Sequence, residues 1–197
     1  MSKILNFLII IFFINIDILS EEIETKVNKG SDLWVQETKS YINNFRNLRG
    51  NFTQIDYVGN ISKGFFWIND KGEIAFHYKA PSEVIIIYKN GKIFFKEKKK
   101  DKFKNFPVTN NPILGLIEEE SNIEDYLASA IIDNNIGKIF ISSNKNNNRN
   151  SLEVIFDYPK PILRQWKIID HQRKETNIFF SKIKYENKIG DQYFITK

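Results

Sequence analysis

The 197-residue sequence contains no cysteine and only two histidines. The absence of cysteine excludes disulfide bonds, thiolate chemistry and cysteine metal sites. The sequence also lacks a GxSxG nucleophile elbow, an HExxH zinc motif and a phosphate-binding glycine loop. His77 lies in a predicted strand and His171 in a predicted turn, where a histidine is usually a solvated surface residue. We therefore expect neither an enzyme nor a bound metal or cofactor.

The chain also lacks an apolar run long enough to cross a bilayer. Its longest run, residues 4–16, is interrupted by Asn6 and Asn15, and a spanning helix needs about 20 apolar residues. Lys3 precedes the run and Ser20 closes it, a pattern typical of a secretory signal peptide. The alternatives are a buried strand and an N-terminal anchor helix. We expect a signal peptide over residues 1–20, and one domain over residues 21–197 that buries about 70% of its unfolded surface.

Positive charge is in excess, with a formal net charge of +5. The densest run is KEKKKDK at Lys96–Lys102, which lies between two predicted strands. It fits a patch for nucleic acid or an anionic membrane, or a solvated hairpin tip whose lysines prevent pairing of strand edges. We favour the hairpin tip and expect no nucleic-acid partner.

The stretch Gly50–Pro112 predicts a meander of antiparallel strands. Ile74, Phe76 and Tyr78 alternate with Glu73, Ala75 and His77. Tight-turn sequences separate the runs: Gly59-Asn60, Asp70-Lys71-Gly72 and Asn90-Gly91. Period-two alternation between such turns is the strongest local hairpin signal.

The remaining elements are predicted to enclose this sheet. Apolar spacing of three and four predicts a helix over Asp32–Leu48, and further helices are expected at Pro112–Ile117 and Ile123–Ala130. The other predicted strands are Asn51–Tyr57, Ile136–Ser143, Leu152–Asp157, Ile162–Asp170, Thr176–Ile183 and Tyr193–Thr196. We expect ten or eleven strands in total.

Aromatic residues are abundant: 17 Phe, 8 Tyr and 3 Trp. The predicted strands Gly64–Ile68 and Val84–Tyr88 are apolar on both faces. Two interpretations follow. One is a sheet covered on both sides; the other is a curved sheet around an apolar cavity, covered by the predicted helices. Composition alone does not decide between them.

Five strings in order resemble the LolA family, periplasmic carriers that take lipoproteins from the inner to the outer membrane. They are FRNLRGNFTQ (Phe45–Gln54), KGFFWINDKGEIAFHYKAPSE (Lys63–Glu83), YKNGKIFF (Tyr88–Phe95), NNPILGLI (Asn110–Ile117) and DYPKPILRQWKIIDHQRKETNIFF (Asp157–Phe180). The resemblance covers essentially all of the chain after the expected signal peptide.

The resemblance implies a mainly β (α+β) fold: a half-open, strongly curved antiparallel β-barrel of about ten or eleven strands, closed by lid helices. The lipid-binding residues that we expect are Ile42, Phe45, Phe66, Ile74, Phe76, Tyr78, Ile85, Ile87, Ile113, Leu114, Leu116 and Ile117. The family commonly has an Arg-Pro pair in the turn before the Ile74 strand, and that Arg hydrogen-bonds lid carbonyls. Here the lid turn is Asp70-Lys71, which lacks a guanidinium fork, so this locking contact does not carry over.

The implied function is a periplasmic lipoprotein carrier that acts as a monomer without a cofactor. Its implied partners are acylated lipoproteins, an inner-membrane ATP-driven releasing complex and an outer-membrane receptor. A carrier of another lipid or glycolipid on the same fold is the first alternative, and a secreted hydrolase with an unrecognised site is the second.

Overall fold

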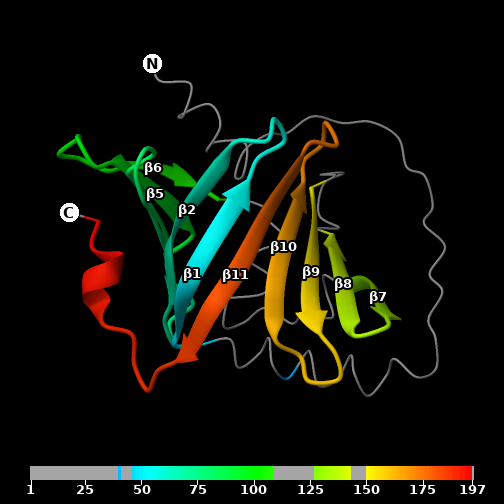
Figure 1. Ribbon diagram of the computed structural model, residues 1–197. Helices are drawn as coiled ribbons and strands as arrows, with labels where there is room; N and C mark the ends of the chain where they lie inside the picture. Colours follow the sequence, from blue (N-terminus) through cyan, green and yellow to red (C-terminus); the bar gives the residue numbers. More distant parts are fainter. Residues whose placement is uncertain (1–39, 41–45, 109–126, 143–149, 197) are drawn as a thin grey trace.

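The computed structural model describes residues 40, 46–108, 127–142 and 150–196, which form one antiparallel sheet of eleven strands (Figure 1). The strands are β1 (Leu48–Ile55), β2 (Ile61–Ile68), β3 (Ile74–Tyr78), β4 (Val84–Lys89), β5 (Lys92–Glu97), β6 (Lys104–Pro107), β7 (Leu127–Asp133), β8 (Ile136–Ser142), β9 (Ser151–Asp157), β10 (Leu163–Ile169) and β11 (Glu175–Tyr185). A 3-10 helix, η2 (Asp191–Phe194), follows β11. No helix among these residues is long and apolar enough to span a membrane.

Two meanders join side by side to make the sheet. Strands β1 to β6 and strands β7 to β11 each run in sequence order, and β1 pairs with β11, so the order is β6-β5-β4-β3-β2-β1-β11-β10-β9-β8-β7. The predicted meander over Gly50–Pro112 and the predicted strand number are confirmed. The lysine-rich run Lys96–Lys102 spans the end of β5 and the exposed tip before β6, as expected for a hairpin tip.

The sheet is not closed into a barrel, because the edge strands β6 and β7 do not pair with each other. The described residues also contain no lid helix. Of the predicted helix Asp32–Leu48, Ser40 is helical, whereas Leu48 already begins β1. The predicted helix Pro112–Ile117 lies outside the described residues. The expected mainly β antiparallel fold is therefore confirmed, whereas closure into a barrel and closure by lid helices are not found in the described residues.

Two other predicted elements are wrong. The helix expected at Ile123–Ala130 is a strand where the structure describes it, because residues 127–133 pair with β8 along the edge of the sheet. The strand expected at Tyr193–Thr196 does not form: Tyr193 and Phe194 end η2, and the two residues after them are in no strand. Phe194 is buried against the side chains of Ala75 and Ile87 on the face of the sheet. Both errors arise because long-range packing overrides local propensity.

Three hairpin turns share one design. In the turn between β1 and β2, the Oδ1 atom of Asp56 accepts hydrogen bonds from the backbone N–H groups of Val58 (2.9 Å) and Asn60 (2.8 Å). Asn69 in the β2–β3 turn and Asp170 in the β10–β11 turn accept the equivalent pairs. A side chain that replaces backbone partners in this way fixes the turn. The residue three positions later has a left-handed φ in each case: Gly59 (88°), Gly72 (72°) and Arg173 (59°).

Candidate functional site

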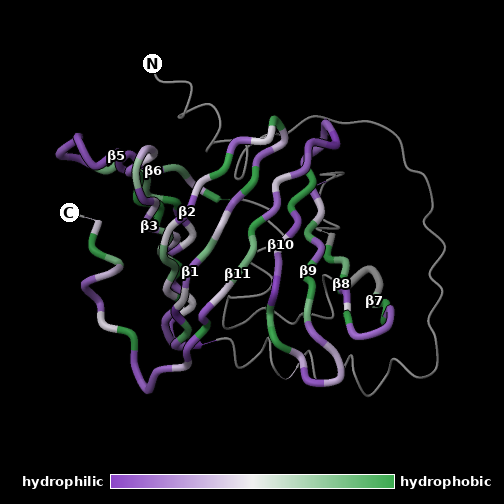
Figure 2. Tube along the Cα trace, viewed as in Figure 1, coloured by the Kyte–Doolittle hydropathy of each residue, from purple (hydrophilic) through white to green (hydrophobic). Residues whose placement is uncertain are grey.

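One face of the sheet is apolar across its strands. Because side chains alternate between faces along a strand, every second residue contributes to it, and Figure 2 shows hydrophobic and hydrophilic residues alternating along the strands. We call it the inner face. Its fully buried hydrophobic residues are Leu48, Phe52, Phe66, Ile68, Ile74, Phe76, Tyr78, Val84, Ile86, Tyr88, Ile93, Phe95, Ile139, Ile141, Leu152, Val154, Phe156, Leu163, Trp166, Ile168, Ile178 and Phe180.

The inner face is concave. Phe76 lies on β3 and Trp166 on β10, which are four strand spacings apart in the sheet. A flat sheet would separate them by about 19 Å, since neighbouring strands lie about 4.8 Å apart. Their ring centroids are only 6.4 Å apart. The sheet therefore curves enough to bring side chains from its two halves into contact.

Five aromatic rings fill the centre of the inner face. We call Phe52, Phe66, Phe76, Trp166 and Phe180 the aromatic cluster. Edge-to-face contacts join Phe52 to Phe76 (5.1 Å between centroids), Phe66 to Phe180 (5.0 Å) and Trp166 to Phe180 (4.9 Å). Such pairs contribute about 0.5–1.5 kcal/mol each beyond the area that they bury. The cluster is thus a packed, directional arrangement at the point where the two halves of the sheet meet.

Gly64 makes room for the ring of Phe52. The two residues are cross-strand partners on β2 and β1. A Cβ atom at position 64 would lie 2.5 Å from the Phe52 ring and 2.2 Å from the carbonyl oxygen of His77. Only glycine allows the ring to lie this close to the backbone of the neighbouring strand. The sequence thus places a small residue opposite an aromatic one where the cluster begins.

One polar pair interrupts the apolar surface. The hydroxyl of Tyr78 donates a hydrogen bond of 2.7 Å to the Oε1 atom of Gln54, and both residues are buried. Burial raises the pKa of the Tyr78 phenol above its ordinary value, because the phenolate would be desolvated. Tyr78 therefore remains a neutral hydrogen-bond donor at physiological pH.

The opposite, outer face is covered over β2 to β5 by the C-terminal segment. Phe194 and Ile189 pack with Ala75 and Ile87 in a second buried cluster. The Tyr193 ring stacks on Trp67 at 4.4 Å between centroids and 14° between planes. Part of the outer face of this half of the sheet is therefore buried as well, around Ala75 and Ile87.

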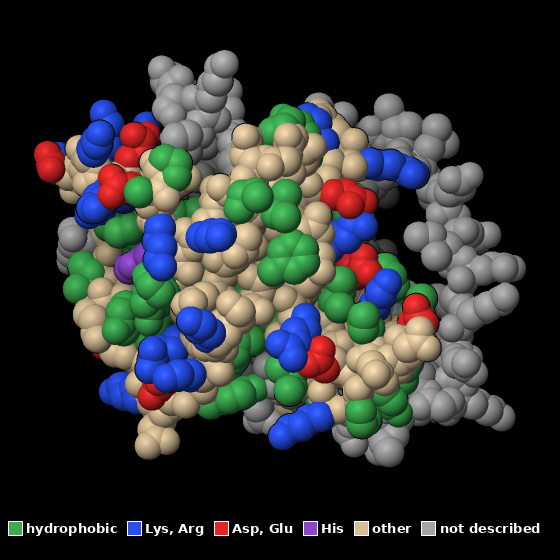
Figure 3. Space-filling view, in the orientation of Figure 1, with side chains coloured by type: hydrophobic (Ala, Val, Ile, Leu, Met, Phe, Trp, Pro, Cys, Tyr) green, Lys and Arg blue, Asp and Glu red, His purple; other side chains and the backbone are tan. Residues whose placement is uncertain are grey.

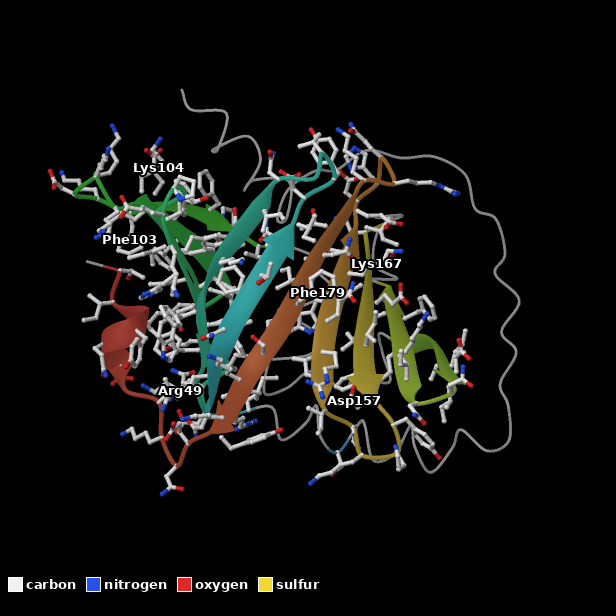
Figure 4. The ribbon with its side chains drawn as sticks, viewed as in Figure 1. Arg49, Phe103, Lys104, Asp157, Lys167 and Phe179 are labelled. Atoms are coloured by element: carbon white, nitrogen blue, oxygen red, sulfur yellow. The ribbon has the colours of Figure 1, made fainter. Side chains whose placement is uncertain are left out.

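Charged and polar side chains occupy the outer face over β8 to β11. Lys167 Nζ lies 3.0 Å from a carboxylate oxygen of Glu175 and 4.0 Å from one of Glu153. Phe179 lies on this face too, 40% exposed beside Lys167 on the neighbouring strand (Figure 4). Figure 3 shows the mixture of charged, polar and scattered hydrophobic groups toward the viewer. The contrast with the inner face makes the concave side the candidate functional face.

His77 belongs to the covered part of the outer face. Its ring lies 4.7 Å from that of Trp67 and is partly buried, contrary to the expected solvated position. Burial lowers the pKa of His77 below 6.5, while a hydrogen bond to the backbone of Tyr193 acts in the opposite sense. His171 is also partly buried. Within the described residues, no three His, Asp or Glu side chains converge to hold a metal ion.

The turn Asp70-Lys71 is held by groups from elsewhere in the chain. The Nη1 atom of Arg46 donates to the backbone carbonyl of Asp70 at 3.2 Å. Lys71 Nζ pairs with the carboxylate of Asp191 in η2, also at 3.2 Å, and this contact raises the pKa of Lys71. A guanidinium therefore reaches this turn from the residues just before β1. The lysine fastens the turn to the C-terminal segment.

The structure brings together some of the predicted lipid-binding residues and separates others. Phe66, Ile74, Phe76 and Tyr78 share the inner face. Ile87 and Ile85 lie on the opposite face, with the C-terminal segment. The other predicted positions, Ile42, Phe45, Ile113, Leu114, Leu116 and Ile117, fall outside the described residues.

The sequence analysis missed three members of the aromatic cluster. Phe52, Trp166 and Phe180 lie on β1, β10 and β11, away from the meander on which the analysis concentrated. Apolar and polar residues alternate in all three segments, for example Trp166, Lys167 and Ile168 in β10. The pairing of β1 with β11 that brings them together was not visible.

Comparisons with known proteins bear on the family and the fold. A protein-family model described as "Outer membrane lipoprotein carrier protein LolA" matches residues 43–197. An uncharacterized conserved protein from Thermus thermophilus has a similar structure, with a TM-score of 0.51, 8% identity, and coverage of 84% of this chain and 93% of that one. No curated protein matches the chain.

Two further solved structures are less similar in shape. For a LolA superfamily protein from Nitrosomonas europaea, the TM-score is 0.46 at 9% identity, with 81% of this chain and 96% of that chain covered. For a putative outer membrane lipoprotein-sorting protein domain from Vibrio parahaemolyticus, the values are 0.47, 11%, 85% and 97%. Because the family model matches well over half of its residues, the chain belongs to the LolA family of outer membrane lipoprotein carrier proteins.

Proposed function

We propose that this protein is a periplasmic carrier that binds the acyl chains of lipoproteins against its inner face and moves them from the inner to the outer membrane. The observation that carries the proposal is the inner face itself, a concave apolar surface extending from β5 to β8. A carrier needs such a surface, because an acyl chain gains about 0.8 kcal/mol for each CH₂ removed from water.

The aromatic cluster supplies a reason why binding is reversible. Its rings already contact one another, so an acyl chain that enters the centre of the inner face must separate them. The free energy lost from these contacts offsets part of the gain from burying the chain. Net affinity is therefore lower than the buried area suggests, which suits a protein that must release its cargo.

In this proposal the chain carries no nucleotide or metal of its own. Acylated lipoproteins are loaded by an ATP-driven complex of the inner membrane and handed to a receptor at the outer membrane. Residues 1–20 direct the protein to the periplasm, and the carrier acts as a monomer.

A matched pair of variants on β4 tests which face binds. Ile86 and Ile87 are adjacent, buried and of the same type, but Ile86 lies on the inner face and Ile87 on the outer one. Replacing either with Thr introduces a hydroxyl and removes one methyl-sized group, and the change is the same at both positions. Binding is measured as displacement of an apolar fluorescent probe from residues 21–197 by a triacylated peptide. The same peptide without acyl chains is the negative control.

We expect Ile86→Thr to weaken displacement by the triacylated peptide and Ile87→Thr to leave it unchanged. Equal or larger loss in Ile87→Thr would place binding on the outer face, and failure of the peptide to displace the probe would refute the proposal. Mass spectrometry of the lipids that co-purify with the protein distinguishes a lipoprotein carrier from a carrier of another lipid.

A further inference from the structure

The part of the inner face formed by β1 to β3 carries polar side chains toward the β1–β2 turn and only apolar ones at the opposite end. At the start of β1, Leu48 pairs with Ile68, and Ile68 pairs with Ile74, which makes a fully buried apolar row across three strands. Six residues further along β1, Gln54 pairs with Ser62 on β2 and with the buried Ile178 on β11. The two rows lie about 20 Å apart, since a strand advances about 3.3 Å per residue. An elongated ligand that lies along β1 to β3 would thus contact hydrocarbon at one end and the side chains of Gln54 and Tyr78 at the other.

Gln54 is the most deeply buried polar group at that end, with no exposed surface. Its Oε1 atom accepts the hydrogen bond from Tyr78, which fixes the orientation of the amide. Its Nε2 atom is buried and finds no acceptor among the described residues. A buried donor without an acceptor costs about 1–3 kcal/mol. The Nε2 group of Gln54 is thus an uncharged hydrogen-bond donor with a fixed direction. Such a donor suits an uncharged acceptor, for example a carbonyl oxygen.

The other polar groups nearby do not compete for that donor. The hydroxyl of Ser62 lies 3.3 Å from the hydroxyl of Ser82. The Asp56 carboxylate, two residues after Gln54, is occupied by the turn of the β1–β2 hairpin, accepting from Val58 and from Asn60. The amide of Gln54 is therefore the group available to a ligand at this end of the inner face.

We infer that Gln54, oriented by Tyr78, binds the carbonyl oxygen of the ester or amide bond that links an acyl chain to its cargo. The inference rests on the proposed function and adds a direction to it: the hydrocarbon extends toward Leu48, Ile68 and Ile74, and the linkage lies beside Gln54. The chemistry selects acyl chains, which carry a carbonyl at their head, over alkyl chains of the same length, which do not.

The test uses two peptides that differ only in this linkage. One carries a diacylglyceryl group on its N-terminal cysteine, with ester bonds, and the other carries the matched dialkylglyceryl group, with ether bonds and no carbonyl. Both displace an apolar fluorescent probe from residues 21–197. We expect the wild-type protein to bind the ester peptide about tenfold more tightly, which is the scale for a hydrogen bond that satisfies a buried donor.

Gln54→Leu should lower affinity for the ester peptide to that for the ether peptide, while affinity for the ether peptide stays the same. Because that variant leaves the Tyr78 hydroxyl without its acceptor, the double variant Gln54→Leu/Tyr78→Phe serves as the folding control and should give the same loss of preference. Tyr78→Phe alone keeps Nε2 but frees the amide to rotate, so its preference should be intermediate. Unfolding by urea confirms that each variant is folded.

Equal affinity of the wild type for both peptides would overturn the inference and leave the proposed function standing. Equal loss of both affinities in the folded double variant would also overturn it, since Gln54 would then act only through packing. Failure of the wild type to bind either peptide would overturn the proposed function, and the inference with it.

Discussion

The rings of Phe76 and Trp166 lie 6.4 Å apart although β3 and β10 are separated by three other strands. This contact reports the curvature of the sheet. It also joins the two meanders through side chains, in addition to the backbone ladder between β1 and β11.

We predict that Phe76 and Trp166 are energetically coupled. In a double-mutant cycle with Phe76→Leu and Trp166→Leu, the interaction term in the free energy of unfolding should be about 0.5–1.5 kcal/mol. Urea unfolding measures each variant. The control cycle pairs Phe76 with Phe179, which is on the outer face, and should be additive. Additivity in the Phe76–Trp166 cycle would mean that the sheet is flatter in solution.

Gly64→Ala should destabilise the protein by about 1–3 kcal/mol, the usual cost of overpacking a core. The new methyl group would meet the Phe52 ring and the backbone of β3. Lys63→Ala, on the exposed side of the same strand, is the control and should change stability little. A Gly64→Ala variant as stable as the wild type would show that the ring of Phe52 does not lie against β2.

Arg173→Gly should stabilise the protein. Arg173 has a φ of 59° at the position where the two matching turns have Gly59 and Gly72. The left-handed conformation costs a residue with a side chain about 1–2 kcal/mol, and glycine removes this cost. Glycine is also more flexible in the unfolded chain, and this offsets part of the gain in stability. We expect a net gain of about 0.5–1 kcal/mol in the free energy of unfolding. The reverse change at the matching position, Gly59→Ala, should lower stability.

Acid should loosen the C-terminal segment through His77. Burial holds the pKa of His77 below its value of 6.5 in an unfolded chain, so the folded protein binds this proton more weakly than the unfolded chain does. The stability contributed by the neutral imidazole is complete above pH 6.5 and is lost as the pH falls from 6.5 toward the lowered pKa. His77→Gln cannot titrate and should reduce the loss of stability between about pH 7.5 and about pH 5.5. An unchanged pH profile in the variant would exclude His77 as a source.

The sequence predicted the parts of the fold that depend on neighbouring residues. Turns such as Asn90-Gly91 and the period-two alternation of Ile74, Phe76 and Tyr78 are local signals, and the β1–β6 meander follows them. Phe66 and Phe76 were expected in the site for the same reason, and both lie on the inner face.

What the sequence did not predict depends on contacts between distant segments. Strand β4 is apolar at every position from Val84 to Tyr88, so alternation could not assign Ile85 and Ile87 to a face. Their packing with the C-terminal segment shows that both lie on the outer face. The contact of Phe76 with Trp166 depends on the register of β1 with β11 and on curvature. Neither has a local signature.

The unpaired edges β6 and β7 have a mechanical consequence. A closed barrel can change its girth only by breaking or sliding hydrogen bonds, whereas the sheet formed by the described strands is open, with β6 at one edge and β7 at the other. Small changes of twist at each of its strand pairs add up to a large displacement between the ends, with every ladder bond kept. The sheet can therefore bend as a whole, and its resting curvature is set by the edge-to-face contacts of the aromatic cluster at its centre.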